Sequence, residues 1–297
     1  MLSNVWSLKG LLAVGAVVLA MAWSVSSASA GLLFSDSFDG MDGTALTTYD
    51  SDYVVTNNAG GIAGRKAEID SPGLSIPWRN SAGNSLYLAV PDSGSPSLNY
   101  EFTNDNDLVN QNPGDSNVYY ASAMFKLDTF GTDSFAAIAV VLPFYKESNA
   151  LERDIRFGLY RRAPVYGSTL HVAAAYESNW AGGTLLADYV VGTTVQVVLK
   201  TTVTSSAGAD TLKFYAAVNP QLSVEPTWAY VGATESATGG WNLDAVRVVC
   251  TAPNNASAGW IDEIRIGTAY SDVVVPEPAT MGLLGLGLVG LVARRRK

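Results

Sequence analysis

The chain of 297 residues contains one cysteine and one histidine, and only 15% of its residues are charged. A single cysteine excludes an internal disulfide, and a single histidine excludes metal sites that are built on several histidines. Residues 31–275 contain 26 acidic and 13 basic residues, which disfavours nucleic acid, since binding to it requires cations against phosphates. This acidic balance is compatible with neutral glycans or with divalent cations as ligands.

The first 30 residues have the three parts of a secretory signal peptide. Lys9 supplies the basic start, an apolar run follows, and Ala28 and Ala30 form a small-residue cleavage site before Gly31. The alternative is an uncleaved anchor helix, which the cleavage site and the helix-poor sequence after it disfavour. We therefore expect residues 1–30 to be removed during export.

Residues 31–273 are predicted to form one all-β domain. Short apolar runs alternate with clusters of Gly, Asn, Asp, Ser and Pro, and no 3.6-residue stripe runs through them. Two runs place apolar residues on one face, namely Val195, Val197, Leu199 and Val203 in one and Ala121, Ala123, Phe125 and Leu127 in the other. Further strands are expected at 135–142, 154–160, 169–176, 211–218, 244–250 and 259–266. Many short strands without helices predict an antiparallel sandwich of two sheets.

Two aspartates lie on the apolar faces of their predicted strands. Alternation groups Asp36 with Leu32, Phe34 and Phe38, and it groups Asp262 with Trp260, Ile264 and Ile266. A buried carboxylate is costly unless it is paired, hydrogen-bonded or bound to a metal. Because Ca²⁺ prefers oxygen ligands, we predict a structural Ca²⁺ held by Asp36, Asp262 and nearby carbonyls, and no other cofactor. The alternatives are hydrogen bonds from loop amides or an arginine, and a local twist that exposes the side chains.

Two tryptophans stand in glycine-containing segments that are predicted to be loops. Trp180 precedes Ala-Gly-Gly, and Trp241 follows a Gly-Gly pair. Aromatic rings that loops present to solvent can stack on sugars, so Trp180 and Trp241 are the predicted glycan-binding residues. The alternative is that these rings cap the edges of the sandwich, and Trp260 is expected in the core.

No catalytic set is complete in the sequence. Glu152 and Asp154 resemble the start of the Glu-x-Asp-x-x-Glu strand of jelly-roll glycanases, but Phe157 stands where the last carboxylate is needed. Polysaccharide lyases often use a Tyr/His pair with an Arg or Lys, and Tyr160, Arg161, Arg162 and Tyr166 lie near His171 in the sequence. Alternation nevertheless makes His171 an ordinary strand residue. There is no Gly-x-Ser-x-Gly elbow and no phosphate-binding loop. We therefore predict a protein without catalytic residues, with a polysaccharide hydrolase or lyase and a purely structural surface protein as alternatives.

The C-terminal residues 274–297 contain three parts in a fixed order. The segment Pro276-Glu277-Pro278 is followed by a glycine-rich apolar run and then by Arg294, Arg295, Arg296 and Lys297. The prolines prevent a continuous helix through the first part. The apolar run of 281–293 would form a helix of about 20 Å, whereas the hydrocarbon core of a bilayer is about 30 Å thick. We expect a short transmembrane helix over about 279–293, with the terminal basic residues as a cytoplasmic membrane stop.

This tail resembles the PEP-CTERM sorting domain of Gram-negative envelope proteins. The resemblance implies that an exosortase-type membrane protease recognises Pro276-Glu277-Pro278, in an organism that makes exopolysaccharide. It also implies export, with an inner-membrane anchor at the C-terminus before processing and release to the cell envelope or the extracellular space afterwards.

Residues 31–273 resemble the concanavalin-like, laminin-G-type jelly roll. The segments 33–39 and 260–267 are similar to the first and last strands of that family, which lie close together. The resemblance implies a two-sheet antiparallel jelly roll, and laminin-G-like modules often hold calcium. Together with the tail, it leads us to expect an exported envelope or matrix protein whose ectodomain is a non-catalytic glycan-binding or adhesion module, with exopolysaccharide as a partner.

Overall fold

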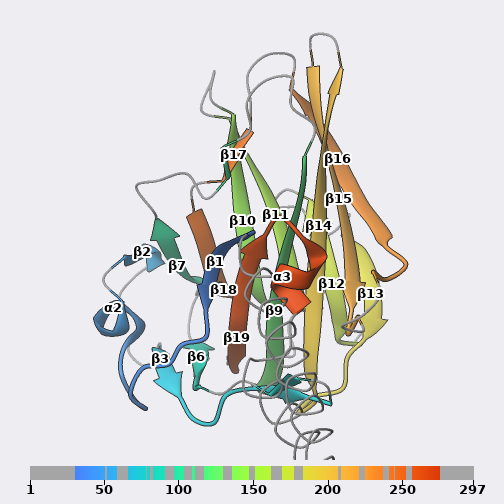
Figure 1. The fold of residues 1–297 in the computed structure, drawn as a ribbon. Coiled ribbons are helices and arrows are strands. Elements are labelled where there is room, and N and C mark those ends of the chain that lie inside the picture. Colours follow the sequence, from blue (N-terminus) through green and yellow to red (C-terminus); the bar gives the residue numbers. More distant parts are fainter. Residues whose placement is uncertain are drawn as a thin grey trace, which may run out of the picture.

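The fold of the described residues is nearly all β, with two short helices, α2 (Leu46–Tyr49) and α3 (Tyr270–Val274) (Figure 1). The predicted signal peptide and the chain beyond Val274 lie outside the described residues. The computed structural model describes residues 31–50, 52–58, 66–77, 79–80, 83–90, 97–103, 109–110, 117–129, 136–146, 151–161, 169–176, 183–206, 209–220, 225–236, 241–243, 245–251 and 256–274.

The first sheet has eight antiparallel strands. Seven of them follow the order β16-β15-β14-β9-β19-β6-β3, and β1 pairs with β19. The first and last strands are therefore hydrogen-bonded neighbours, as expected from the sequence. The strands are β1 (Leu32–Asp36), β3 (Lys66–Asp70), β6 (Ser85–Val90), β9 (Val118–Thr129), β14 (Thr194–Ser206), β15 (Ala209–Val218), β16 (Ala229–Ser236) and β19 (Ser257–Gly267).

The second sheet has nine antiparallel strands. Seven follow the order β13-β12-β11-β10-β18-β7-β2, and β17 joins β10 to β8. A small separate ribbon consists of β4 (Ser75–Ile76) and β5 (Arg79–Asn80). The strands of the second sheet are β2 (Tyr53–Asn58), β7 (Ser97–Thr103), β8 (Val109–Asn110), β10 (Ala136–Lys146), β11 (Leu151–Arg161), β12 (His171–Tyr176), β13 (Thr184–Asp188), β17 (Trp241–Leu243) and β18 (Ala245–Thr251).

The order of the strands is that of a jelly roll. Among the pairs of consecutive strands that cross from one sheet to the other are β6 and β7, β9 and β10, and β18 and β19. In both sheets the strand of the last pair lies between those of the other two, in the orders β6-β19-β9 and β7-β18-β10. Paired strands wound in this way around a two-sheet sandwich define the jelly roll, so the predicted fold class is confirmed.

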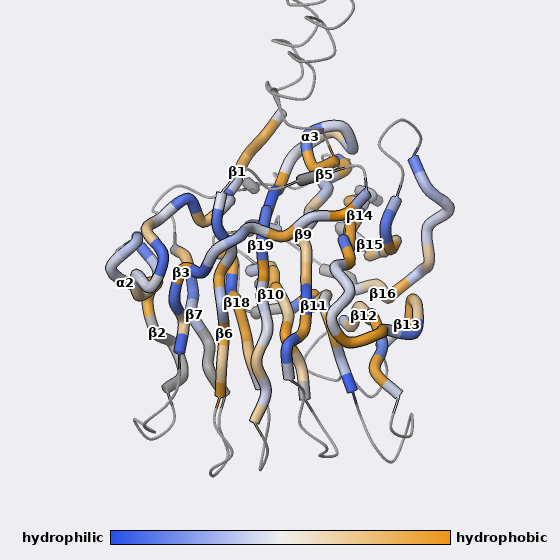
Figure 2. The backbone as a smooth tube through the Cα atoms, turned by 90° about the horizontal axis from the view of Figure 1, so that it is seen from below, coloured by the Kyte–Doolittle hydropathy of each residue, from blue (hydrophilic) through white to orange (hydrophobic). Residues whose placement is uncertain are grey.

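The core lies between the two sheets, and the sequence alternation predicts much of it. All eight apolar residues that alternation assigned to single faces of 195–203 and 121–127 are buried in this core. Hydrophobic and hydrophilic residues alternate along many strands, as the view from below shows (Figure 2). Each of the six further strands that the sequence predicted is also present, as β10, β11, β12, β15, β18 and β19.

The last strand, β19, departs from simple alternation at a β-bulge. In β19, Glu263 has a φ of 51°, and the pairing with β9 shifts between Asp262 and Arg265. Such a bulge inserts one extra residue, so side chains two positions apart across it lie on opposite faces. Ile264 therefore enters the core, whereas Asp262 lies on the outer face opposite Met124 of β9. The prediction that Asp262 and Ile264 share a face is wrong for this reason.

Candidate functional site

Asp36 lies on the core side of β1, where local donors satisfy it. Its carboxylate accepts hydrogen bonds from the Phe38 backbone N–H at 2.8 Å and from the hydroxyls of Tyr49 at 3.1 Å and Tyr53 at 2.8 Å. Burial raises the pKa of Asp36 above its usual value, although these hydrogen bonds oppose the shift. Burial raises the pKa of Tyr53, and the neighbouring Asp36 carboxylate adds to this shift.

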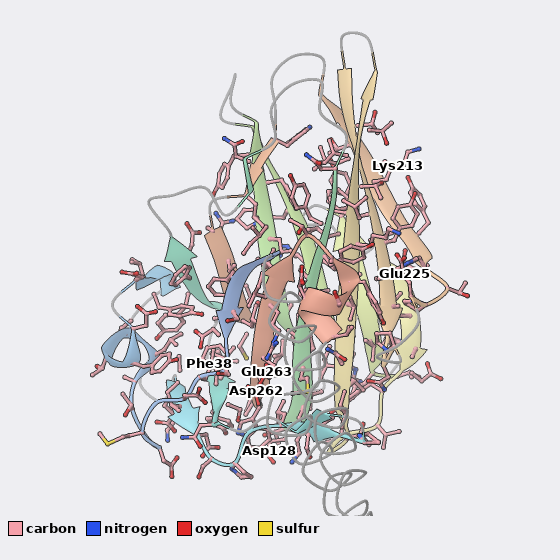
Figure 3. The ribbon with its side chains drawn as sticks, viewed as in Figure 1. Phe38, Asp128, Lys213, Glu225, Asp262 and Glu263 are labelled. Carbon is pink, nitrogen blue, oxygen red and sulfur yellow. The ribbon has the colours of Figure 1, made fainter. Side chains whose placement is uncertain are left out.

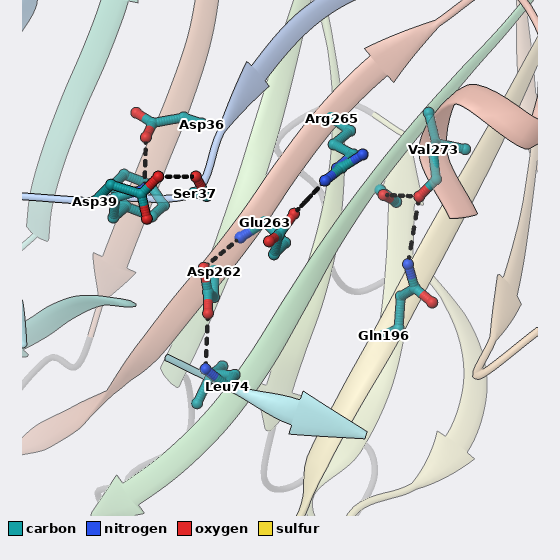
Figure 4. A network of polar contacts seen from close by, with 11 residues as sticks. Asp36, Ser37, Asp39, Leu74, Gln196, Asp262, Glu263, Arg265 and Val273 are labelled. Atoms are coloured by element: carbon teal, nitrogen blue, oxygen red, sulfur yellow. Dashed lines mark hydrogen bonds and ion pairs between the residues drawn. The ribbon is translucent and has the colours of Figure 1, made fainter. Parts of the chain in front are cut away.

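Asp262 lies on the opposite face of the eight-stranded sheet and is fully buried. It accepts hydrogen bonds from the backbone N–H groups of Leu74 and Glu263, both at 2.7 Å (Figure 4). Asp36 shares its face with Ile264, its cross-strand partner, so the two aspartates point away from each other. One Ca²⁺ held by both is incompatible with this arrangement, because the bulge in β19 separates them. Within the described residues, no three His, Cys, Asp or Glu side chains are grouped to hold a metal.

The predicted sugar-stacking tryptophans do not form an open site in the described residues. Trp241 is the first residue of β17, and its side chain is fully buried in the core, so the prediction that it contacts a glycan is wrong. The pairing of β17 with β10 turns an expected loop residue inward. Trp180 lies outside the described residues. Trp260 is half-buried on the outer face rather than in the core, and its indole N–H donates to Asp70 at 2.7 Å.

The outer face of the nine-stranded sheet carries a chain of paired charges. Arg247 contacts the carboxylates of Glu101 and Asp154, and it donates a hydrogen bond to the Tyr145 hydroxyl at 2.9 Å. Asp154 also pairs with Arg156 at 2.8 Å. Both carboxylates are thus held by arginines, and the chain carries Phe157, a core residue, where a glycanase strand needs its last carboxylate.

The same face brings one of the two tyrosines considered for a lyase site beside His171. Tyr160 of β11 and His171 of β12 are direct cross-strand partners, and His171 Nδ1 lies 3.1 Å from Asp188 Oδ1. Sequence proximity suggested this pair, but only the register could establish it. Tyr160 is fully buried and His171 is 7% exposed, so neither presents a surface to a polymer in this structure.

A row of side chains that sequence reasoning missed crosses the outer face of the eight-stranded sheet. The registers of β9, β14, β15 and β16 place Tyr120, Lys200, Tyr215 and Tyr230 opposite one another in turn. Neighbouring strands are about 4.8 Å apart, so this aromatic row runs across the strands for about 14 Å. Tyr230 is 56% exposed, and its ring centroid lies 5.7 Å from that of Tyr215.

Glu225 fixes the centre of the aromatic row. Its Oε1 accepts hydrogen bonds from Lys200 Nζ at 2.5 Å, from the Trp228 indole N–H at 2.9 Å and from the Tyr120 hydroxyl at 3.2 Å. Lys200 Nζ also lies 5.7 Å from the ring centroid of Tyr120 and 5.6 Å from that of Trp228. The hydrogen bond from Lys200 is the largest cause that lowers the pKa of Glu225, so this carboxylate stays charged at neutral pH.

A depression of about 460 Å³ continues the aromatic row at the ends of β9 and β14. Val118 and Thr202 are the next outward-facing residues after Tyr120 and Lys200, and they pair with each other across the two strands. Lys213 of β15 lies on the other side of Thr202, on the same side of the molecule as Glu225 (Figure 3). The lining is uncharged and rich in hydroxyl groups, and it consists of Asn117, Val118, Tyr119, Thr202, Val203, Thr204 and Thr268.

The C-terminal segment matches a known family model. The description of that family is a PEP-CTERM protein-sorting motif, and the match spans residues 274–297. The tail is a PEP-CTERM sorting motif. This match confirms the resemblance of the tail to the PEP-CTERM sorting domain. The motif implies processing by an exosortase and export to the cell envelope or the extracellular space. No curated protein sequence matches the chain.

Several solved structures are similar to this chain at low sequence identity. The cellulose induced protein Cip1 is 14% identical, with 80% of this chain and 97% of Cip1 covered and a TM-score of 0.45. A carbohydrate esterase from the Shiga toxin-encoding bacteriophage phi24B is 12% identical, with coverage of 80% and 98% and a TM-score of 0.46. The lectin UEA-II in complex with galactose is 7% identical, with coverage of 79% and 98% and a TM-score of 0.39.

The sorting elements themselves lie outside the part of the chain that the structure describes. These are Ala28 and Ala30 of the cleavage site, Pro276-Glu277-Pro278, the expected helix over 279–293 and the basic cluster of 294–297. Neither of the two described helices has the length and apolar character needed to cross a bilayer. Gly31, which would be the new N-terminus after signal cleavage, accepts a hydrogen bond from the backbone N–H of Thr268 at 2.9 Å.

Proposed function

We propose that this chain is an exported envelope or matrix protein whose ectodomain binds a neutral polysaccharide without catalysing its breakdown. The observation that carries this proposal is the cross-strand register that aligns Tyr120, Lys200, Tyr215 and Tyr230 into one row. The sorting motif supports the extracellular setting. The proposed binding surface consists of Lys200, Tyr215 and Tyr230 of the aromatic row, Trp228 and the adjoining depression, whereas Tyr120 is buried beneath α3.

The chemistry of this surface suits a sugar polymer. Aromatic rings can cover the apolar faces of sugar rings, while hydroxyl and amide groups in the depression can exchange hydrogen bonds with sugar hydroxyls. Tyr120 is only 8% exposed, so the accessible part of the row consists of Lys200, Tyr215 and Tyr230. At about 4.8 Å per strand it extends for about 10 Å, which favours an extended chain over a single sugar. Because Glu225 already holds Lys200, Trp228 and Tyr120 in place, little side-chain entropy is lost on binding.

The charges of the surface favour an uncharged polymer. Lys200 is paired with Glu225, and none of the residues that line the depression is charged. The excess of acidic residues over 31–275 would also repel a polyanion. A neutral glycan needs no charged partner in the depression and is not repelled by the acidic residues.

The absence of catalysis is part of the proposal, and the other sheet supports it. Glu101 and Asp154 are both bound by Arg247, whereas a glycosidase needs one carboxyl group that can give up a proton and one that is available as base or nucleophile. The rival function is a polysaccharide lyase, because the register places Tyr160 beside His171. Their burial favours a structural role for both side chains.

The membrane steps complete the proposal. The signal peptide would be removed before Gly31, and the apolar helix of about 279–293 would hold the chain in the inner membrane until the exosortase acts. The basic cluster of 294–297 would keep the end of the chain in the cytoplasm. The released ectodomain would then contact exopolysaccharide.

Retention on polysaccharides, measured together with the release of sugar, tests this proposal. The purified protein is passed over a panel of neutral and acidic polysaccharides, and soluble reducing or unsaturated sugars are assayed in the same fractions. We expect retention on a neutral polymer without sugar release, both before and after His171→Ala. Sugar release that His171→Ala abolishes would establish the lyase instead, and neither retention nor release would leave a structural surface protein.

A further inference from the structure

The residues directly before the sorting motif are packed onto the outer face of the eight-stranded sheet. The short helix α3 lies against β9 and β19 (Figure 1). Val273 and Val274 are buried against Tyr120 and Val198. The ring of Tyr270 packs edge-on against the row, with its centroid 6.0 Å from that of Tyr120. This end of the described chain is therefore held by specific contacts.

Polar groups of the sheet and of the chain beside α3 also contact this helix. The hydroxyl of Ser122 donates a hydrogen bond to the carbonyl of Val273 at 2.8 Å, and Gln196 Nε2 lies 3.5 Å from the same oxygen (Figure 4). Asp272 Oδ2 accepts a hydrogen bond from the backbone N–H of Ala269 at 2.8 Å. The backbone of Gly31 lies so close that an added Cβ would stand 2.5 Å from Asp272 Oδ2. The predicted new N-terminus and α3 thus meet at one place.

This docking leaves almost no free chain before the motif. Val274 is the last residue of α3 and also the first residue of the PEP-CTERM match. Only Val275 separates it from Pro276 in the sequence. Proteases act on accessible, extended segments, and residues that are buried in a helix cannot enter a protease cleft. The docked α3 therefore restricts access to the segment that the exosortase must recognise.

The docking is also weak enough to open without unfolding of the sandwich. A helix of five residues is not stable on its own, so α3 depends on its contacts. Gln196 beneath it is fully buried, and its Oε1 has no hydrogen-bond partner among the described residues. An unpaired buried oxygen is costly, and water could satisfy it once α3 lifts. Terminal elements with few contacts open locally far more often than the whole fold.

We propose that α3 is a latch that controls sorting: the PEP-CTERM motif becomes a substrate for the exosortase when α3 leaves the sheet. The balance between docked and undocked α3 then sets the rate of processing. This inference rests on the sorting motif and on the contacts of α3, and it is independent of glycan binding.

An insertion between α3 and the motif makes the motif accessible without undocking α3. The full-length chain is expressed in a host that carries the cognate exosortase, and the processed fraction is followed over time by mass. Six Gly and Ser residues are inserted between Val275 and Pro276, which moves the motif away while α3 stays docked. We expect processing to accelerate several-fold with an unchanged melting temperature. An unchanged or slower rate would overturn the latch.

A substitution in the sheet tests the effect of weakening the contact between the sheet and α3. Ser122→Ala removes the hydrogen bond to Val273, and the net value of one such bond corresponds to about fivefold more undocked α3 and about fivefold faster processing. Thr129→Ala is the matched control, since it removes an exposed hydroxyl from the far end of the same strand, β9. Equal rates for Ser122→Ala and Thr129→Ala would contradict the proposal. If Ser122→Ala does not fold, the insertion alone decides.

Discussion

Lys200 Nζ lies 2.5 Å from Glu225 Oε1, and this ion pair stands at the centre of the aromatic row. The lysine comes from the middle of β14, and the glutamate from the segment before β16. Their contact ties that segment and Trp228 to the sheet. The pair thus shapes the surface that we assign to glycan binding, although neither of its residues lines the depression.

Replacing the carboxylate should disturb this surface. We expect Glu225→Gln to reduce retention on the bound polysaccharide several-fold, because Lys200 and Trp228 lose their shared charged acceptor. The side chain of Glu225 is 42% exposed, so solvent screens the pair and the loss of folding stability should stay below about 1 kcal/mol. Glu68→Gln is the matched control, since Glu68 pairs with Lys66 on β3, far along the same sheet.

The pH dependence follows from the lowered pKa of Glu225. A carboxyl group whose pKa is lower in the folded state stabilises the fold at pH values above its unfolded pKa of 4.5. That contribution disappears as the pH falls through the lowered folded pKa. Melting curves of the parent and of Glu225→Gln should therefore differ at neutral pH and converge in acid, and a difference that grows in acid would contradict the assignment.

Removal of divalent cations should leave the fold unchanged. Asp36 and Asp262 lie on opposite faces of the sheet, and backbone N–H groups and tyrosine hydroxyls satisfy both of them. We expect the same melting temperature in calcium and in chelator. A clear fall in chelator would show that a metal site exists and would reinstate calcium as a structural ion.

The sorting motif makes a prediction about processing. Glu277→Ala should leave the chain membrane-bound and unprocessed, because the exosortase loses the charged residue between the two prolines. Mass spectrometry and membrane fractionation of the expressed protein measure both effects. A mature mass identical to that of the parent would contradict the role assigned to this residue.

Local patterns were sufficient for the strands that face the core. Alternation in 121–127 and 195–203 placed correctly all eight apolar residues that it assigned to one face, because side-chain direction in an unbroken strand depends only on position. Alternation failed at Asp262, since nothing in the neighbouring residues marks the bulge at Glu263. The expectation that Trp241 lies in a loop, which rested on the preceding Gly-Gly pair, failed for another reason. Its burial follows from the pairing of β17 with β10, a strand about 100 residues away in the chain.

The aromatic row shows why the functional site was harder to find than the fold. Each of its residues lies on the outward face of a strand, and parity alone can predict that much. Their alignment depends on the registers of three strand pairs, β9 with β14, β14 with β15, and β15 with β16. A bulge in the last pair adds a further shift. No sequence period encodes these registers.

The most direct test of the glycan-binding surface is the affinity of the purified protein and of two matched variants for the polysaccharide that retains it. Tyr230→Ala removes the most exposed ring of the row, whereas Tyr87→Ala removes a tyrosine from β6, on the same face but beyond β19. We predict about tenfold weaker binding for Tyr230→Ala, the loss expected for one aromatic contact, and unchanged binding for Tyr87→Ala. Unchanged binding for Tyr230→Ala, or equal losses for both variants, would contradict the assignment of this surface.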